Sequence, residues 1–190
     1  MIAPTLQTQR LVIQSIKVSD AHAMFLYRSD KTVQRYQFWR PRTQGEVEDF
    51  IQKVNELAFD TEHTWYQLGI YTKQPRELIG DLGLHFLEPH NSQVEIGFTI
   101  APTHQRQGYA AEAVISILDY VFAHMRKHRV IASVDPNNTA SIALLKKLGL
   151  RQEAHFVQSL WDDGAWLDDV VYAILREEWM RIAYGEKPGK

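Results

Sequence analysis

The stretch Val94-Glu-Ile-Gly-Phe-Thr-Ile100, followed by Gln105-Arg-Gln-Gly-Tyr-Ala110, guides the interpretation of this chain. The apolar, β-branched run predicts a strand that ends before Pro102, and helical spacing of apolar residues begins at Ala110. A tight loop that opens a helix presents unpaired backbone N–H groups, and the helix dipole adds positive potential at the same point. Gly108 lets the backbone approach a bound group closely. The stretch therefore predicts a site for a phosphate or pyrophosphate.

The glycine pattern of this loop separates it from the two commonest nucleotide-binding loops. No Gly-Lys-Ser/Thr follows it, and it has one of the three glycines of the dinucleotide-binding pattern. The spacing instead resembles Gln/Arg-x-x-Gly-x-Gly/Ala, the acetyl-coenzyme A signature of the GNAT superfamily of N-acetyltransferases. Six residues taken alone are equally compatible with an ordinary strand–helix turn, so the rest of the chain decides between the two interpretations.

The composition indicates one folded domain, which we expect to cover residues 1–190. The formal net charge of −2 argues against a surface that binds nucleic acid directly. We expect no membrane partner, because no apolar stretch approaches the ~18 residues of a membrane span. We expect no secretory signal, because the first residues lack its basic and apolar regions. The chain has no cysteine, which excludes disulfides, thiolate metal sites and a cysteine nucleophile. We therefore expect a cytoplasmic protein without a metal site, either a monomer or a homodimer.

Hydrophobic periodicity and turn residues predict elements in the order β-α-α-β-β-β-α-β-α-β-β. Thr43-Gln-Gly-Glu46 is a capping-box pattern, Gly149 is a natural helix terminator, and Asp162-Asp-Gly164 predicts a hairpin turn. A mixed α/β sheet with helices on both faces is the simplest way to bury these elements. The expected strands are 10–16, 65–71, 77–86, 94–100, 130–134, 153–161 and 166–175, and the expected helices in this order are 20–27, 43–58, 106–125 and 137–147. A further short helical piece is expected at 30–35.

Further motifs extend the resemblance to the GNAT superfamily. The segment from Asn138 to Leu150 is similar to the family element Asn-x-x-Ala/Ser-x-x-Leu-x-x-x-x-Gly-Phe, with leucine in place of the final Phe. Thr8-Gln-Arg10-Leu11, Glu95-Ile-Gly97-Phe98 and Gly164-x-Trp166-x-Asp168 resemble the Rim-type branch, which contains the ribosomal-protein N-terminal acetyltransferases and their relatives. The resemblance implies the GNAT fold, with a mostly antiparallel mixed sheet in which two strands splay apart.

The resemblance also implies that acetyl-CoA binds between the splayed strands. In the family a bulge at the place of Gly97 separates these strands, and the following backbone pairs with the pantetheine arm. The loop after the strand wraps the pyrophosphate through backbone N–H groups. Asn138 would hold the pantetheine amide, although it could be merely a helix N-cap. The expected cofactor-binding residues are Phe98, Thr99, Ile100, Gln105, Arg106, Gln107, Gly108, Tyr109, Ala110, Ala111, Asn138 and Ser141.

Direct attack of an amine on the thioester, without an acyl-enzyme, follows from the same resemblance. Many members use a tyrosine acid seven residues after the asparagine, but Leu145 occupies that position here. We expect Ser141 to stabilise the departing thiolate instead, with packing as its alternative role. Glu95 is expected to help deprotonate the amine, and a solvent-facing strand glutamate is the alternative. The direction of Glu95 depends on whether its strand carries a bulge.

The Rim-type resemblance implies that the acceptor is the α-amine of a protein or peptide. Its ordinary pKa of about 7.7–8.0 leaves far more neutral amine at pH 7 than the value of about 10.4 for lysine. The expected substrate-binding residues are Tyr36, Phe38, Trp39 and His85. A small-molecule amine (polyamine, antibiotic or amino acid) is the alternative acceptor, and a non-catalytic acyl-CoA-binding module is the alternative class of protein.

Overall fold

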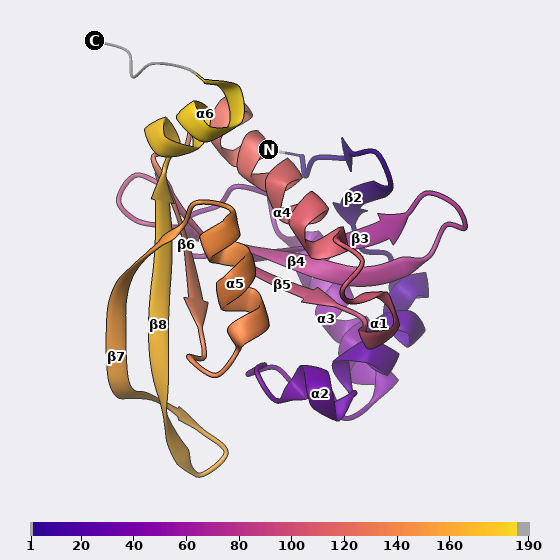
Figure 1. Ribbon diagram of the computed structural model, residues 1–190. Coiled ribbons are helices and arrows are strands. Elements are labelled where there is room, and N and C mark those ends of the chain that lie inside the picture. Colours follow the sequence, from indigo (N-terminus) through magenta and orange to yellow (C-terminus); the bar gives the residue numbers. More distant parts are fainter. Residues whose placement is uncertain (1, 186–190) are drawn as a thin grey trace.

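An eight-stranded sheet forms the centre of the molecule, and helices cover both of its faces (Figure 1). The computed structural model describes residues 2–185. Across the sheet the strands follow the order β1-β2-β3-β4-β5-β6-β8-β7. Their bounds are β1 (Leu6–Gln7), β2 (Leu11–Ser15), β3 (Trp65–Thr72), β4 (Leu78–Leu87), β5 (Gln93–Ile100), β6 (Arg129–Val134), β7 (Arg151–Asp162) and β8 (Ala165–Leu175).

The helices form two groups, with α4 and α5 on one face of the sheet and α1 and α3 on the other (Figure 1). This arrangement confirms the predicted mixed sheet with helices on both faces. No helix in residues 2–185 is long and apolar enough to cross a membrane. The bounds are α1 (Ala21–Arg28), α2 (Lys31–Gln34), α3 (Gln44–Glu56), α4 (Tyr109–Asp119), α5 (Thr139–Lys147) and α6 (Arg176–Tyr184).

The two central strands β5 and β6 separate part of the way along their length. They are the parallel pair in a sheet of otherwise antiparallel neighbours, and their ladder ends at Glu95↔Ile131. Beyond that point β5 continues to Ile100 against β4, and β6 continues to Val134 against β8. The splayed strands that the resemblance implies are therefore present, and a gap opens after Glu95.

The bulge expected at Gly97 is wrong. The β4–β5 register is regular on both sides of it, from His85↔Glu95 through Gly83↔Gly97 to Asp81↔Thr99. The strands separate because β6 leaves β5 to follow β8, so β5 needs no extra residue. A Cβ placed at Gly97 would meet nothing within 4 Å, which leaves open space beside this strand.

Helix starts agree with the predictions where a side chain caps the helix. Thr43 accepts a hydrogen bond from the Glu46 amide at 3.2 Å, but the Glu46 carboxylate bonds the amide of Arg42 rather than that of Thr43. The predicted capping box is therefore only half formed. Helix α4 begins at Tyr109 rather than at residue 106, because the backbone at Arg106 and Gly108 is left-handed.

The structure contains two elements, strand β1 and helix α6, that the sequence did not predict. Strand β1 has only two residues, which is too short for a periodic signal. Helix α6 follows β8 directly, with no glycine or proline between them. Its start is marked by Glu178, which accepts a hydrogen bond from the Leu175 amide at 2.8 Å, and Trp179 anchors it in the core with 3% exposure.

Apolar side chains fill both sides of the sheet. The main core packs β2 to β6 and β8 against α4 and α5, and each fully buried large side chain contributes about 1.5–3 kcal/mol. A second cluster joins α1 and α3 to the opposite face through Met24, Val47, Ile51 and Tyr71. The main core contains residues from both edges of the β5–β6 gap, Ile96 and Ile100 on β5 and Val130 and Ala132 on β6.

Candidate active site

A cleft of about 430 Å³ lies where α4 begins, beside the end of β5 and the start of α5. It brings together nearly all of the residues that the sequence predicts for the cofactor. Gln107 is the exception, because its side chain bonds the Thr103 carbonyl and its own carbonyl accepts from Arg10. The predicted residues on the cleft are Phe98, Thr99, Ile100, Gln105, Arg106, Gly108, Tyr109, Ala110, Ala111, Asn138 and Ser141.

The loop that ends in α4 has an unusual backbone conformation. Gly108, the N-cap of α4, has φ of 81°, and Arg106 has φ of 60°. The side-chain amide of Gln105 donates to the Ile100 carbonyl at 2.9 Å, which ties the loop to the end of β5. The first amides of a helix have no partner within the helix, so this end of α4 suits an anion.

The start of α5 forms another wall of this cleft. Asn138 accepts a hydrogen bond from the Ser141 amide at 3.2 Å, so it acts as the N-cap of α5, one of its two expected roles. Within the described chain, the Ser141 hydroxyl has no hydrogen bond to another residue. Leu145, the position at which the resemblance led us to look for a tyrosine, is fully buried and lines neither this cleft nor the cavity beside it.

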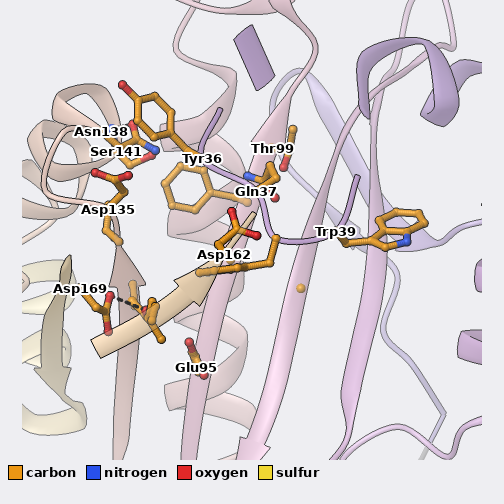
Figure 2. Close-up of a pocket in the computed structure, with 18 of the residues that line it drawn as sticks. Tyr36, Gln37, Trp39, Glu95, Thr99, Asp135, Asn138, Ser141, Asp162 and Asp169 are labelled. Atoms are coloured by element: carbon orange, nitrogen blue, oxygen red, sulfur yellow. Dashed lines mark hydrogen bonds between the residues drawn. The ribbon is translucent and has the colours of Figure 1, made fainter. Parts of the chain in front are cut away.

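A second cavity, of about 470 Å³, adjoins the first (Figure 2). Its walls come from the segment 35–40, from strands β3 to β6 and from the β7–β8 hairpin. Three of the residues expected to bind substrate line it: Tyr36, Phe38 and Trp39. The two cavities meet, because both are lined by Tyr36, Gln37, Phe98, Thr99, Asn138 and Ser141.

Glu95 lines this second cavity, which answers the question of its direction. In the regular register it shares a face of the sheet with His85, which lies directly opposite on β4. Nδ1 of His85 and Oε2 of Glu95 are 3.2 Å apart, and the histidine ring stacks on Trp65 with centroids 4.7 Å apart. His85 itself does not line the cavity, but it contacts two residues that do, Trp65 and Glu95, and the Glu95 side chain is 21% exposed.

A buried ion pair between Arg28 and Asp81 lies beneath this cavity. The Asp81 carboxylate is fully buried and accepts hydrogen bonds from Tyr27 (2.6 Å), Arg28 (3.1 Å from Nε) and Gln67. Burial raises the pKa of Tyr27, and the Asp81 charge raises it further. Burial opposes the charge of Arg28, but Asp81 outweighs it and raises the pKa of Arg28. Arg28 in turn donates to Gln37 at 2.8 Å, where the two cavities meet.

Several groups on the cavity are not among the site residues expected from the sequence. Asp169 is 8% exposed and accepts a hydrogen bond from the Ser133 hydroxyl at 2.7 Å (Figure 2). Arg40 and Asp162 form an ion pair that joins the segment before α3 to the β7–β8 hairpin. The partners in these contacts are far apart in the sequence. The one sequence signal for Asp162 and Asp169 was the motif Gly164-x-Trp166-x-Asp168, which lies between them.

The chain matches the family model for the acetyltransferase (GNAT) domain over residues 10–151. It is 34% identical to YnaD, an uncharacterised N-acetyltransferase of Bacillus subtilis, over 90% of this chain and 97% of that protein. It is 26% identical to the ribosomal protein uS5-alanine N-acetyltransferase of Escherichia coli, over 66% of this chain and 64% of that protein.

A solved structure supports the same family as the sequence relatives do. A GNAT-family acetyltransferase from Bacillus anthracis superimposes with a TM-score of 0.82 and 28% identity, over 92% of this chain and all of that one. The family match covers well over half of the 190 residues, and it includes both the α4 loop and the start of α5. This chain therefore belongs to the GNAT family and is an N-acetyltransferase.

Proposed function

We propose that the protein transfers an acetyl group from acetyl-CoA to the α-amine of a protein or peptide N-terminus. The observation that carries this proposal is the junction of the two cavities. One cavity suits the carrier, the other suits an amine, and the Tyr36, Asn138 and Ser141 side chains lie where they meet. A donor and an acceptor bound in adjoining cavities can react without an enzyme-bound acyl group.

The first cavity fits acetyl-CoA through its backbone. The left-handed residues Arg106 and Gly108 turn the loop around the start of α4, where unpaired amides favour a diphosphate. The gap between β5 and β6 leaves the backbone after Glu95 without a neighbouring strand on that side. An extended pantetheine arm suits such an edge, because its amides can pair with backbone groups in the manner of an added strand.

In the proposed reaction Glu95 receives the proton of the attacking amine, directly or through water. The C–N bond forms as the C–S bond breaks, and the Ser141 hydroxyl donates a hydrogen bond to the departing sulfur. His85 holds the carboxylate of Glu95 at 3.2 Å and limits its motion. The amine nitrogen needs a free electron pair, so an α-amine makes a smaller demand on this base than a lysine does.

The charge of the second cavity supports a cationic acceptor. Carboxylates outnumber arginines along its walls: the lining acids are Glu95, Asp135, Asp162, Asp168 and Asp169, and the lining arginines are Arg28, Arg35 and Arg40. Arg28 is paired with Asp81 and Arg40 with Asp162, while Arg35 lies over the Tyr36 ring. Phe38, 61% exposed, offers an apolar contact for the residue that follows the reacting amine. The similarity to the uS5-alanine acetyltransferase supports a protein N-terminus as the acceptor.

The test is to incubate the pure protein with acetyl-CoA and a panel of amines, and to measure release of free CoA and the mass of the products. The panel contains short peptides with free N-termini, the same peptides blocked at the N-terminus, polyamines, aminoglycosides and amino acids. Turnover of free but not blocked peptides is the expected result. Turnover of small amines alone would contradict the proposed acceptor, and binding of acetyl-CoA without any turnover would favour a non-catalytic module.

A further inference from the structure

The Thr8-Gln-Arg10-Leu11 motif lies next to the loop that begins α4, although nearly a hundred residues separate them in sequence. Nε of Arg10 donates to Oε2 of Glu112 at 2.6 Å, and Nη1 donates to the Gln107 carbonyl at 2.9 Å. The guanidinium carbon also lies 4.4 Å from the centre of the Tyr109 ring. One side chain thus contacts three residues of this loop and of the first turn of α4.

Thr8 and the Arg10 backbone complete the same arrangement. The Thr8 hydroxyl and the Arg10 amide both donate to Oε1 of Glu112, at 2.6 and 2.8 Å. The Thr8 hydroxyl oxygen also accepts from the Leu11 amide at 2.9 Å. Burial by itself would raise the pKa of Glu112, but the hydrogen bonds from Thr8 and Arg10 and the Arg10 charge lower it. The Glu112 side chain is therefore held as a carboxylate by hydrogen bonds from Thr8 and Arg10.

The hydrogen bond from Arg10 to the Gln107 carbonyl also fixes the direction of the Gly108 amide. A peptide unit is planar and trans, so its C=O and N–H groups point in opposite directions. When Arg10 holds the Gln107 carbonyl, the Gly108 amide hydrogen points away from Arg10. Gly108 lines the cofactor cleft, and its backbone is left-handed, so the loop needs support to keep this conformation.

The charge of Arg10 matters as well. Glu112 lies in the first turn of α4, where an unpaired carboxylate would reduce the attraction of the helix start for another anion. Arg10 pairs with this carboxylate and restores a positive local potential. Its Nη2 atom lies 3.4 Å from where a Cβ of Gly108 would be, so the guanidinium is beside the loop rather than across the domain.

We propose that Arg10 is a positioning residue for the diphosphate of acetyl-CoA, acting through the Gln107 carbonyl and Glu112. It aims the Gly108 amide at the diphosphate and offsets the Glu112 charge at the helix start. This inference rests on the proposed use of acetyl-CoA, and it assigns a role to a motif that the proposed reaction does not otherwise use.

The test compares Arg10→Ala with Arg76→Ala. Arg76 is a matched control, because it also stacks on a tyrosine, Tyr71 at 5.1 Å, but lines neither cavity of the site. We expect Arg10→Ala to weaken acetyl-CoA binding about tenfold in calorimetry, the effect of one charged hydrogen bond. We expect Arg76→Ala to bind acetyl-CoA as the wild type does.

A truncated donor separates positioning from general damage to the fold. Acetyl-pantetheine lacks the diphosphate, so its kcat/KM should be the same for Arg10→Ala and the wild type with an accepted amine. Equal losses with both donors, or unchanged acetyl-CoA binding, would overturn the inference. If Arg10→Ala does not fold, Arg10→Lys keeps the charge without the planar fork and should show a smaller loss of the same selectivity.

The binding measurement uses no acceptor amine, so its outcome is independent of the proposed acceptor. A wild-type protein that does not bind acetyl-CoA would refute the proposed function itself. A wild-type protein that binds it, with an Arg10→Ala variant that binds equally well, would refute the role of Arg10 alone.

Discussion

The two adjoining cavities are built in different ways. The cofactor cleft depends mainly on one continuous segment, β5 with the loop and start of α4, and on its backbone conformation. The acceptor cavity depends on side chains from the segment 35–40, from four strands and from the β7–β8 hairpin. A backbone site tolerates changes of side chain, whereas a side-chain site changes its chemistry with each substitution. Under the proposed function, carrier recognition and acceptor choice therefore depend largely on different parts of the chain.

The ion pair beneath the acceptor cavity should give the largest effect on stability. Asp81→Ala leaves Arg28 buried without its carboxylate, so we predict a loss of about 3–5 kcal/mol in the free energy of unfolding. Chemical denaturation measures it. Asp162→Asn is the control, because the Arg40–Asp162 pair is partly exposed and should contribute only about 0–1 kcal/mol. Equal losses in the two variants would contradict a special role for the buried pair.

Two glycines with the same left-handed backbone, one beside the cofactor cleft and one far from it, test whether the cleft depends on its local backbone conformation. Gly108 has φ of 81° and Gly164, in the β7–β8 turn, has φ of 83°. Substitution by alanine should lower the stability of each by about 1–2 kcal/mol, since both positions are left-handed. We predict that only Gly108→Ala also weakens acetyl-CoA binding, by about tenfold. Calorimetry of both variants decides this, and a comparable loss of affinity in Gly164→Ala would show that strain anywhere disturbs the cleft.

A smaller effect is expected on the stability of the protein in acid, through Glu112 of α4 and its hydrogen bonds from Thr8 and Arg10. The pKa of Glu112 is lowered in the folded protein, because the hydrogen bonds from Thr8 and Arg10 outweigh burial. Its contribution to stability is complete above the unfolded value of about 4.3 and is lost as the pH falls through the lower folded value.

We therefore predict that Glu112→Gln is less stable than the wild type at pH 7, by less than about 1 kcal/mol, and that the difference shrinks below pH 4. Thermal unfolding at several pH values measures it. Glu56→Gln, on an exposed residue at the end of α3, is the control and should show no such convergence. A difference that grows in acid would contradict the assigned sign.

The same contrast explains how much could be predicted from the sequence. The β5 strand, the glycine at position 108 and the asparagine that caps α5 carry local signals, because each depends on neighbouring residues in the chain. The structure places all three beside the cleft at the start of α4. Gln107, which was also predicted to lie there, instead bonds Thr103 and Arg10. The bulge at Gly97 is the error, since the separation of the strands is decided by β6 and β8, far along the chain.

The acceptor cavity was predicted less completely for a physical reason. Asp169 meets Ser133 across two strands, and Arg40 meets Asp162 over 122 residues of sequence. Such contacts are fixed by tertiary packing and leave no local pattern. The direction of Glu95 was undecided for the same reason, because it depends on the register between β4 and β5.

Under the proposed function, a cofactor cleft made from backbone adjoins an acceptor cavity whose base is Glu95. The most direct measurement pairs acetyl-CoA affinity with turnover for Glu95→Gln, with Asp169→Asn as the matched carboxylate control. We predict that Glu95→Gln binds acetyl-CoA as the wild type does, while its kcat falls about 10²-fold or more. We also predict that Asp169→Asn, which removes a carboxylate that lines the cavity but does not take the proton, raises the KM of the amine and keeps most of its kcat. Unchanged turnover in Glu95→Gln, or a loss of acetyl-CoA binding that matches its loss of turnover, would contradict the claim.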